Sequence, residues 1–226
     1  MKPKLKTFLT VVGVFVLFLA MLFGFALNIK GLTAWGYAQK YQKTGYSNPD
    51  VVLMGSSTIQ NWKTSVSDLG PLKTVNVGIG GTVVRDWFSY LDTLVTPFAP
   101  KAVLVYVAAN DLHNDHRDPG DVAADLTRLL DDLHAALPEA KLYYVSVYAT
   151  GAQPESRADE KTLNDAMAAL CEGSAHLRYI DCAAALIGAD GDIREELFRG
   201  DLVHLNDAGY EIWTETIKRA LDADLS

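Results

Sequence analysis

Residues 51–62 read VVLMGSSTIQNW, and this stretch decides the expected fold. Four apolar residues, Val51 to Met54, are followed by Gly55 and then by two serines. A continuous apolar run that ends at a glycine is typical of a strand buried on both faces. A serine at such a strand end can present a reactive hydroxyl, and it can equally cap a helix. The stretch therefore predicts a buried strand and a turn, with Ser56 and Ser57 as alternative nucleophiles.

Further apolar runs follow along the chain, and segments with helical spacing lie between them. The runs are TVNVG at 74–78, AVLVYVAAN at 102–110, KLYYVSVYA at 141–149 and LRYIDC at 177–182. The helical segments are 83–95, 121–137 and 158–172. Apolar strands that alternate with amphipathic helices indicate a parallel sheet covered on both faces. The sequence predicts one α/β domain, a three-layer α/β/α sandwich with five strands.

The N-terminus has a different composition from the rest of the chain. Lys2, Lys4 and Lys6 precede a 23-residue segment, Thr7 to Ile29, that carries no charge. As a helix this segment spans roughly 34 Å, enough for a bilayer core of about 30 Å. We predict a membrane anchor at residues 1–30, a juxtamembrane linker at 31–49 and the main domain at 50–226. A cleaved signal peptide is the alternative, although the apolar segment is long for one.

Charge and topology restrict the partners and the location. Residues 31–226 carry 16 basic and 28 acidic side chains, a balance of −12, which argues against nucleic acid. The lysines before the apolar segment favour a cytoplasmic N-terminus, so we expect a single-pass membrane protein with its main domain outside the cytoplasm. Cys171 and Cys182 are expected to be separate thiols rather than a disulfide.

Polar residues that follow the strands are the candidates for a site, because ligands of such folds bind at the carboxyl ends of the strands. One further motif, DLVHLNDAGYEIW, precedes the last helical segment. In it Asp201 and His204 lie three residues apart, so the carboxylate can reach the nearer ring nitrogen. An imidazole held by a carboxylate is the base that a serine nucleophile needs. Taken alone, this spacing is more often an ordinary surface loop.

The glycines in NVGIGG allow two interpretations. Gly78, Gly80 and Gly81 resemble a phosphate-binding loop, but neither the spacing nor a following acidic residue fits a dinucleotide fingerprint. A glycine at a strand end also lets a backbone N–H approach a ligand closely. We therefore interpret Gly81 as a donor to an oxyanion.

The segment VAANDLHNDH also has two interpretations. Asn110 can donate a side-chain N–H to an oxyanion. Alternatively, a metal ion could be bound by the acidic residues and histidines of this segment, which are Asp111, His113, Asp115 and His116. The chain offers no obvious further ligands, so we expect no metal. The remaining histidines, His134 and His176, are expected at the surface.

Four motifs in this order and spacing resemble the SGNH (GDSL-like) hydrolase superfamily. They are VLMGSSTIQNW, NVGIGGT, AAND and DLVHLNDAGYEIW, and the resemblance covers about residues 51–221. It implies a flavodoxin-like sheet and a catalytic triad of Ser57, His204 and Asp201. It also implies an oxyanion hole formed by the N–H groups of Ser57 and Gly81 and by the Asn110 amide.

Two positions depart from the family pattern. Ser56 stands where the family often has aspartate, and Ala108 stands where its third motif usually has glycine. By its place in the motif, Ser57 is the nucleophile, and Ser56 is expected to tether the loop. The change at Ala108 leaves Asn110 in place but puts the conformation of the loop in question.

The sequence thus predicts a membrane-anchored serine esterase or acylhydrolase that works without cofactor or metal. Its substrate is expected to be a small-molecule, glycan or lipid ester, cleaved through an acyl-enzyme. One alternative is an O-acyltransferase that uses a sugar hydroxyl in place of water. Another is a non-catalytic surface binding domain that has kept the fold.

Overall fold

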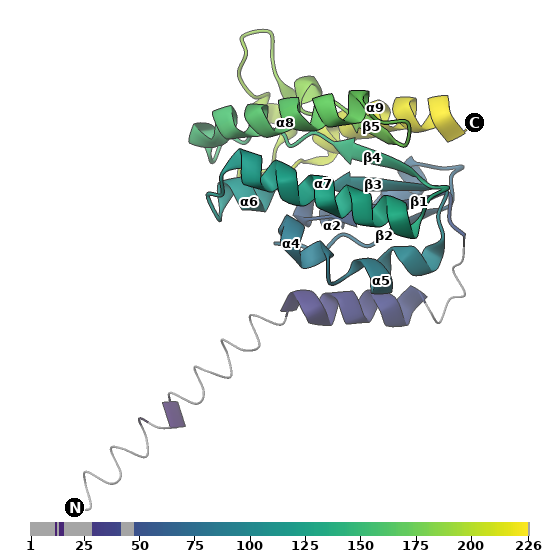
Figure 1. The fold of residues 1–226 in the computed structure, drawn as a ribbon. Helices are drawn as coiled ribbons and strands as arrows, with labels where there is room; N and C mark the ends of the chain where they lie inside the picture. The colour runs from purple at the N-terminus through teal and green to yellow at the C-terminus, as the bar shows by residue number, and fades with distance from the viewer. Residues whose placement is uncertain (1–11, 13, 16–28, 42–47, 226) are drawn as a thin grey trace, which may run out of the picture.

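The computed structural model describes residues 12, 14–15, 29–41 and 48–225. A single sheet of five parallel strands, in the order β2-β1-β3-β4-β5, forms the centre of the domain (Figure 1). The strands are β1 (Val51–Gly55), β2 (Thr74–Asn76), β3 (Ala102–Tyr106), β4 (Lys141–Val145) and β5 (Leu177–Ile180). The predicted parallel five-stranded sheet is therefore confirmed.

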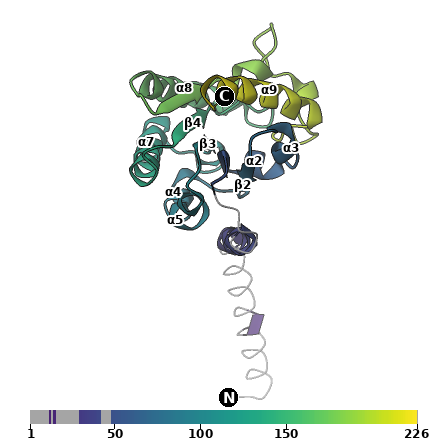
Figure 2. The same cartoon turned by 90° about the vertical axis from the view of Figure 1, so that its right-hand side faces the viewer.

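Helices cover both faces of this sheet, as the end-on view in Figure 2 shows. The four that pack on one face are α4 (Val84–Trp87), α5 (Leu91–Leu94), α7 (Pro119–Ala136) and α8 (Arg157–Glu172). The other face is covered by α2 (Ser57–Asn61), α3 (Ser65–Asp68) and α9 (Asp207–Leu225). The short helix α6 (Ala109–His113) follows β3 directly.

The alternation of side chains along each strand divides the core into two parts. In β1, Val52 and Met54 pack with α4, α5, α7 and α8, whereas Val51 and Leu53 pack with α2 and α9. All four side chains are fully buried. Strands that are apolar on both sides therefore require helices on both sides, which is the physical reason for the three layers.

The two cysteines fall on opposite sides of this division. Cys171 of α8 belongs to the first part of the core and Cys182, just after β5, to the second. Both are free thiols, as expected. The sheet lies between them.

Some local expectations need correction. The segment 83–95 forms two short helices, because hydrogen bonds from Ser89 to Asp86 and from Tyr90 to Trp87 close tight turns between them. The apolar run at 102–110 is a strand only as far as Tyr106. His134 and His176 are partly buried and stack on each other, with ring centroids 3.6 Å apart.

The N-terminal region was expected to hold an anchor and a linker. Residues 29–41, mostly within the expected linker, form a helix that lies against the domain (Figure 1). No helix within the described ranges is long and apolar enough to cross a bilayer. Most of the predicted anchor lies outside the described residues.

Candidate active site

Ser57 lies where β1 meets α2, at the carboxyl edge of the sheet. Gly55 has a φ of 153°, and a Cβ atom there would come within 1.9 Å of the Tyr106 carbonyl oxygen. Only glycine lets β1 turn so close to β3. The Ser56 N–H donates to the same carbonyl, at 3.1 Å, so the turn is fixed by the backbone. The Ser56 side chain caps no N–H of α2, so the expected tether is made by its backbone and not by its hydroxyl.

His204 and Asp201 complete a chain of hydrogen bonds with this serine. The Ser57 Oγ lies 3.0 Å from His204 Nε2, and His204 Nδ1 lies 2.8 Å from Asp201 Oδ2. These three side chains, predicted from motifs 147 residues apart in sequence, are thus brought together. With Nδ1–H donating to the carboxylate, Nε2 is left to accept the serine proton.

The electrostatics of Asp201 favour this arrangement. Burial alone would raise the pKa of Asp201, but hydrogen bonds from the backbone and ring of His204 and from the Val203 N–H lower it to about 2. Both backbone groups donate to Asp201 Oδ1, at 2.9 and 3.0 Å. The carboxylate is therefore ionised at neutral pH and holds the ring in one orientation.

The loop that carries Asp201 and His204 is held by contacts within itself and to its neighbours. The Arg199 N–H donates to the His204 carbonyl at 2.7 Å, and Asn206 Nδ2 donates to the Phe198 carbonyl at 3.0 Å. Asn206 Oδ1 also accepts the Gly209 N–H at 3.0 Å, so it caps α9. This loop lies outside the sheet.

Asn110 lies in the first turn of α6 and not at the end of a strand. Its Nδ2 donates to the Thr82 carbonyl at 2.9 Å, and its Oδ1 accepts from Asn114 Nδ2 at 2.9 Å. The amide is thus oriented at both ends. Ala108 has a φ of 102°, a conformation that a Cβ atom disfavours and that explains the glycine usual in this motif.

The loop with Gly81 is anchored by Asn76. The Asn76 side chain donates to the Ile59 carbonyl at 2.8 Å and accepts the Gly78 N–H at 3.0 Å. A Cβ at Gly80 would lie 3.8 Å from the Ser57 Cβ, so this loop reaches the nucleophile. Gly81 itself has a φ of 74°. Among the described residues, its N–H and that of Ser57 take part in no backbone hydrogen bond.

A small cavity opens beside the serine. It has a volume of about 30 Å³ and includes Ser57 and Asn110 in its wall. Tyr106, Tyr148 and His113 line the rest of it, together with neighbouring small residues. A cavity that holds one water molecule needs a volume of roughly 10–15 Å³. The cavity therefore admits a group of only a few heavy atoms.

Two residues of the alternative metal site, Asp111 and His113, have other partners. Asp111 accepts from Arg117 at 2.7 Å and from the Val84 N–H at 3.0 Å. His113 Nε2 lies 2.5 Å from Glu160 Oε1 in a buried pair. Within the part of the chain that the structure describes, no three histidine, cysteine or acidic residues are grouped so that they could hold a metal ion.

Two features of this site were missed from the sequence. One is the buried pair of His113 and Glu160, and a signal for it exists, because Glu160 falls on the same helical face as the buried Leu163 and Met167. The other is the ion-pair chain from Asp111 through Arg117 to Asp125, which ties α6 to α7. Its members lie in polar segments, where the sequence does not distinguish paired from solvated charges.

A five-stranded parallel sheet with a hydrogen-bonded serine, histidine and aspartate at its carboxyl edge is the arrangement found in SGNH hydrolases. The profile of the GDSL-like lipase/acylhydrolase family matches residues 35–212, most of the chain. The chain therefore belongs to this family, whose members hydrolyse esters. A search of curated proteins finds no match.

Solved structures share the fold at low sequence identity. A GDSL-like lipase from Bacteroides thetaiotaomicron is 17% identical with a TM-score of 0.70, over 85% of this chain and 100% of that one. A carbohydrate esterase family 3 protein from Talaromyces cellulolyticus is 21% identical with a TM-score of 0.63, over 78% and 99%. A catalytic mutant of an acetylxylan esterase from Geobacillus stearothermophilus is 16% identical with a TM-score of 0.63, over 76% and 94%.

Proposed function

We propose that the protein is a membrane-anchored serine esterase that removes short acyl groups outside the cytoplasm. The observation that carries the proposal is the hydrogen-bonded chain Ser57–His204–Asp201, with distances of 3.0 and 2.8 Å. Such a chain activates a hydroxyl that is otherwise a weak nucleophile.

In the first half-reaction the Ser57 Oγ attacks the ester carbonyl carbon while its proton passes to His204 Nε2. The tetrahedral oxyanion accepts hydrogen bonds from the Ser57 and Gly81 N–H groups and from Asn110 Nδ2. The C–O bond to the alcohol then breaks, and the alcohol leaves with the proton from His204. Asp201 keeps the ring oriented and stabilises its positive charge throughout.

In the second half-reaction water attacks the acyl-enzyme. His204 Nε2 takes a proton from the water as its oxygen bonds to the acyl carbon, and the same three donors hold the new oxyanion. Collapse breaks the bond to Ser57 Oγ, which regains a proton from His204, and a carboxylic acid is released. No cofactor enters either step.

The small cavity supports a short acyl group. A space of about 30 Å³ beside Ser57 and Asn110 matches an acetyl group better than a fatty acyl chain. A carbohydrate esterase and an acetylxylan esterase share the fold, which supports an O-acetylated glycan as the substrate class. The uncharged segment Thr7 to Ile29 supports the membrane anchor.

The test uses the full-length protein in detergent and in membranes. A fluorophosphonate probe is expected to label the wild type and the Ser56→Ala variant but not Ser57→Ala. Among p-nitrophenyl esters, kcat/KM is expected to fall by roughly ten-fold or more from acetate to octanoate, because the longer chain does not fit.

Three outcomes would contradict separate parts of the proposal. Labelling that is lost only in Ser56→Ala would overturn the assignment of the nucleophile. A preference for octanoate over acetate would show that the small cavity does not bind the acyl group. Release of the protein from membranes by carbonate washing would contradict the anchor.

A further inference from the structure

The helix at residues 29–41 is firmly fixed to the domain along its inner side. Ala34 is buried in the core, and the hydroxyls of Tyr37 and Tyr41 donate to the carbonyls of Gly78 and Asn76, at 3.1 and 3.0 Å. Lys30 forms an ion pair with Asp86 at 2.6 Å. The helix is therefore a rigid part of the domain, and its orientation is set by the same loop that carries Gly81.

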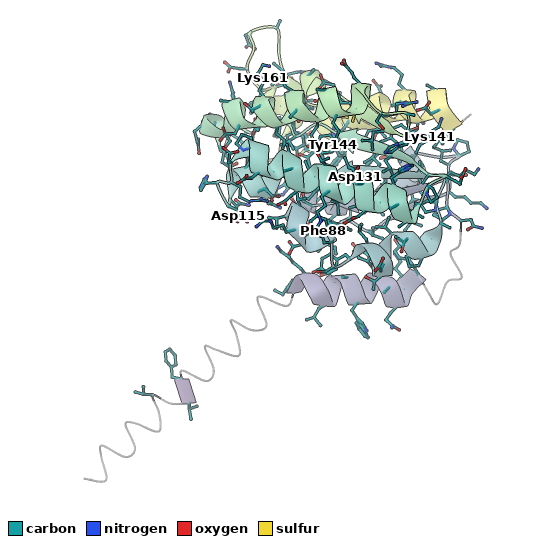
Figure 3. All side chains as sticks on the ribbon, viewed as in Figure 1. Phe88, Asp115, Asp131, Lys141, Tyr144 and Lys161 are labelled. Atoms are coloured by element: carbon teal, nitrogen blue, oxygen red, sulfur yellow. The ribbon has the colours of Figure 1, made fainter. Side chains whose placement is uncertain are left out.

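The outer side of this helix is apolar and exposed. Ile29, Leu32 and Trp35 are 51%, 46% and 65% exposed and recur every third residue, which places them on one side. Side chains project there away from the body of the domain (Figure 3). Among the described residues, every exposed large hydrophobic side chain except Val66 lies at or before residue 35. An apolar group of this kind on a water-soluble domain indicates an interaction surface.

The sequence before the helix indicates what covers this surface. The uncharged segment from Thr7 ends at Ile29, the first residue of the described part of the docked helix. Trp35 lies only about 9 Å further along the helix axis than Ile29, at 1.5 Å per residue. Tryptophan and lysine next to an apolar span are typical of the headgroup region of a bilayer, and Lys40 follows Trp35 in the same helix.

We infer that the outer side of the 29–41 helix, formed by Ile29, Leu32 and Trp35, lies in the headgroup region of the membrane. This inference rests on the proposed membrane anchor and extends it. The domain is then not suspended on a flexible linker but lies on the lipid surface along a helix. Interfacial helices of this kind bury their apolar side about 5–10 Å into the boundary between headgroups and acyl chains.

The position of the helix also orients the catalytic edge of the sheet. Lys30 Cε would lie 3.8 Å from a Cβ at Gly81, so the first turn of the helix lies next to the oxyanion loop. In Figure 1 this end of the helix lies below α4, on the side of the molecule where α6 is found. The edge that carries Ser57 is therefore the edge at which the chain meets the membrane. Esters that project from the membrane surface are the substrates in reach.

The chain contains its own reporter for a test. It has four tryptophans, and Trp62, Trp87 and Trp213 are at most 1% exposed. Trp35 is thus the tryptophan that responds to an external quencher. The full-length protein is reconstituted into phosphatidylcholine and phosphatidylglycerol vesicles, and fluorescence is measured with iodide, with a headgroup-proximal nitroxide lipid and with a nitroxide deep in the acyl chains.

The expected result is strong quenching by the shallow nitroxide, weaker quenching by the deep one and little by iodide. Trp35→Phe removes the quenched component. Leu32→Asp is expected to expose Trp35 to iodide, because the charged side chain lifts this side of the helix from the lipid. The matched control Val66→Asp changes an equally exposed apolar side chain on α3 and leaves the quenching unchanged.

Quenching of Trp35 by iodide and not by either lipid would overturn the inference. Two parallel measurements separate this outcome from failure of the proposed function. Resistance to carbonate washing reports the anchor alone, and fluorophosphonate labelling reports Ser57 alone.

Discussion

The two halves of the catalytic site are built differently. Ser57, Gly81 and Asn110 belong to the segments that follow the neighbouring strands β1, β2 and β3, whose side chains are almost entirely buried. Asp201 and His204 belong to a turn outside the sheet, and their side chains are 48% and 27% exposed. One half is positioned by strand register and the other by hydrogen bonds within a short loop.

The two halves of the site are thus held in position by different parts of the structure. The donors and the nucleophile are held by the core, so they move only if the sheet moves. The base and its carboxylate are held by a few bonds near the surface, and Asp201 Oδ1 accepts two of them. Mutations in the exposed half are therefore expected to affect chemistry more than folding.

The largest effect is expected for His204→Ala. The imidazole moves the proton in both half-reactions, so kcat is expected to fall by about 10⁴–10⁶-fold. Because the side chain is part-exposed and in a loop, the melting temperature is expected to change little. Activity on a short ester and thermal unfolding are measured on the same preparation. Near-normal turnover of His204→Ala would show that the triad does not carry out the reaction.

Asp201→Asn is expected to cost about 10²–10⁴-fold in rate, because the amide no longer fixes the tautomer of the ring. In the wild type, kcat/KM should rise with pH to a plateau between about pH 5 and 8, because the base must be unprotonated to accept the serine proton. The Asp201 carboxylate, with its pKa lowered to about 2, is ionised over that whole range. A flat wild-type profile from about pH 5 to 8 would contradict the role of the base.

The same pKa shift predicts a small dependence of stability on pH. A carboxyl whose pKa is lowered by folding contributes stability above its unfolded pKa of about 3.9, and this contribution is lost as the pH falls towards 2. The wild type is therefore expected to lose its advantage over Asp201→Asn only in acid below about pH 4. Exposure of the side chain to solvent keeps the difference small.

In the buried half, Asn110→Ala is expected to lower kcat by about 10²–10³-fold with little change in KM, because the donor acts on the oxyanion and not on the bound ester. Asn114→Ala is the matched control. It removes one of the two groups that orient the Asn110 amide and leaves the bond to the Thr82 carbonyl, so its effect should be much smaller. Equal effects of the two variants would show that the amide is structural.

The smallest effect is expected in local opening of the backbone, and it is measured on the wild-type protein. Backbone amides of residues 199–206 are expected to exchange with deuterium faster than those of β1 and β3, since the loop can open without disturbing the sheet. Hydrogen exchange followed by mass spectrometry measures both. Equal protection would mean that the exposed half is held as tightly as the buried one.

The sequence predicted most of this site because its chemistry is local. Ser57, Asp201 and His204 lie in short motifs, and the order of the motifs places them at one edge of a parallel sheet. The strands were visible because residues buried on both faces leave an unbroken apolar run. The cysteines could be placed only once the sheet was known.

What the sequence did not predict depends on contacts between distant residues. The 29–41 helix was interpreted as a linker, although Ala34, Tyr37, Ala38 and Tyr41 recur at helical spacing, because the core surface on which they pack is formed by distant parts of the chain. The helical pattern places Glu160 on the buried face of α8, but it does not identify His113, 47 positions away, as its partner. The positive φ of Ala108 shows that a departure from the family's glycine can be tolerated when the surroundings hold the turn.

The placement of the two cysteines determines how the folded domain responds to an oxidising compartment. Burial raises the pKa of the Cys171 thiol to about 11 and that of Cys182 well above its usual value, so neither forms the thiolate that attacks a disulfide. With the sheet between them they have no route to each other. In the folded domain the two thiols are therefore expected to stay free in a reducing or an oxidising compartment.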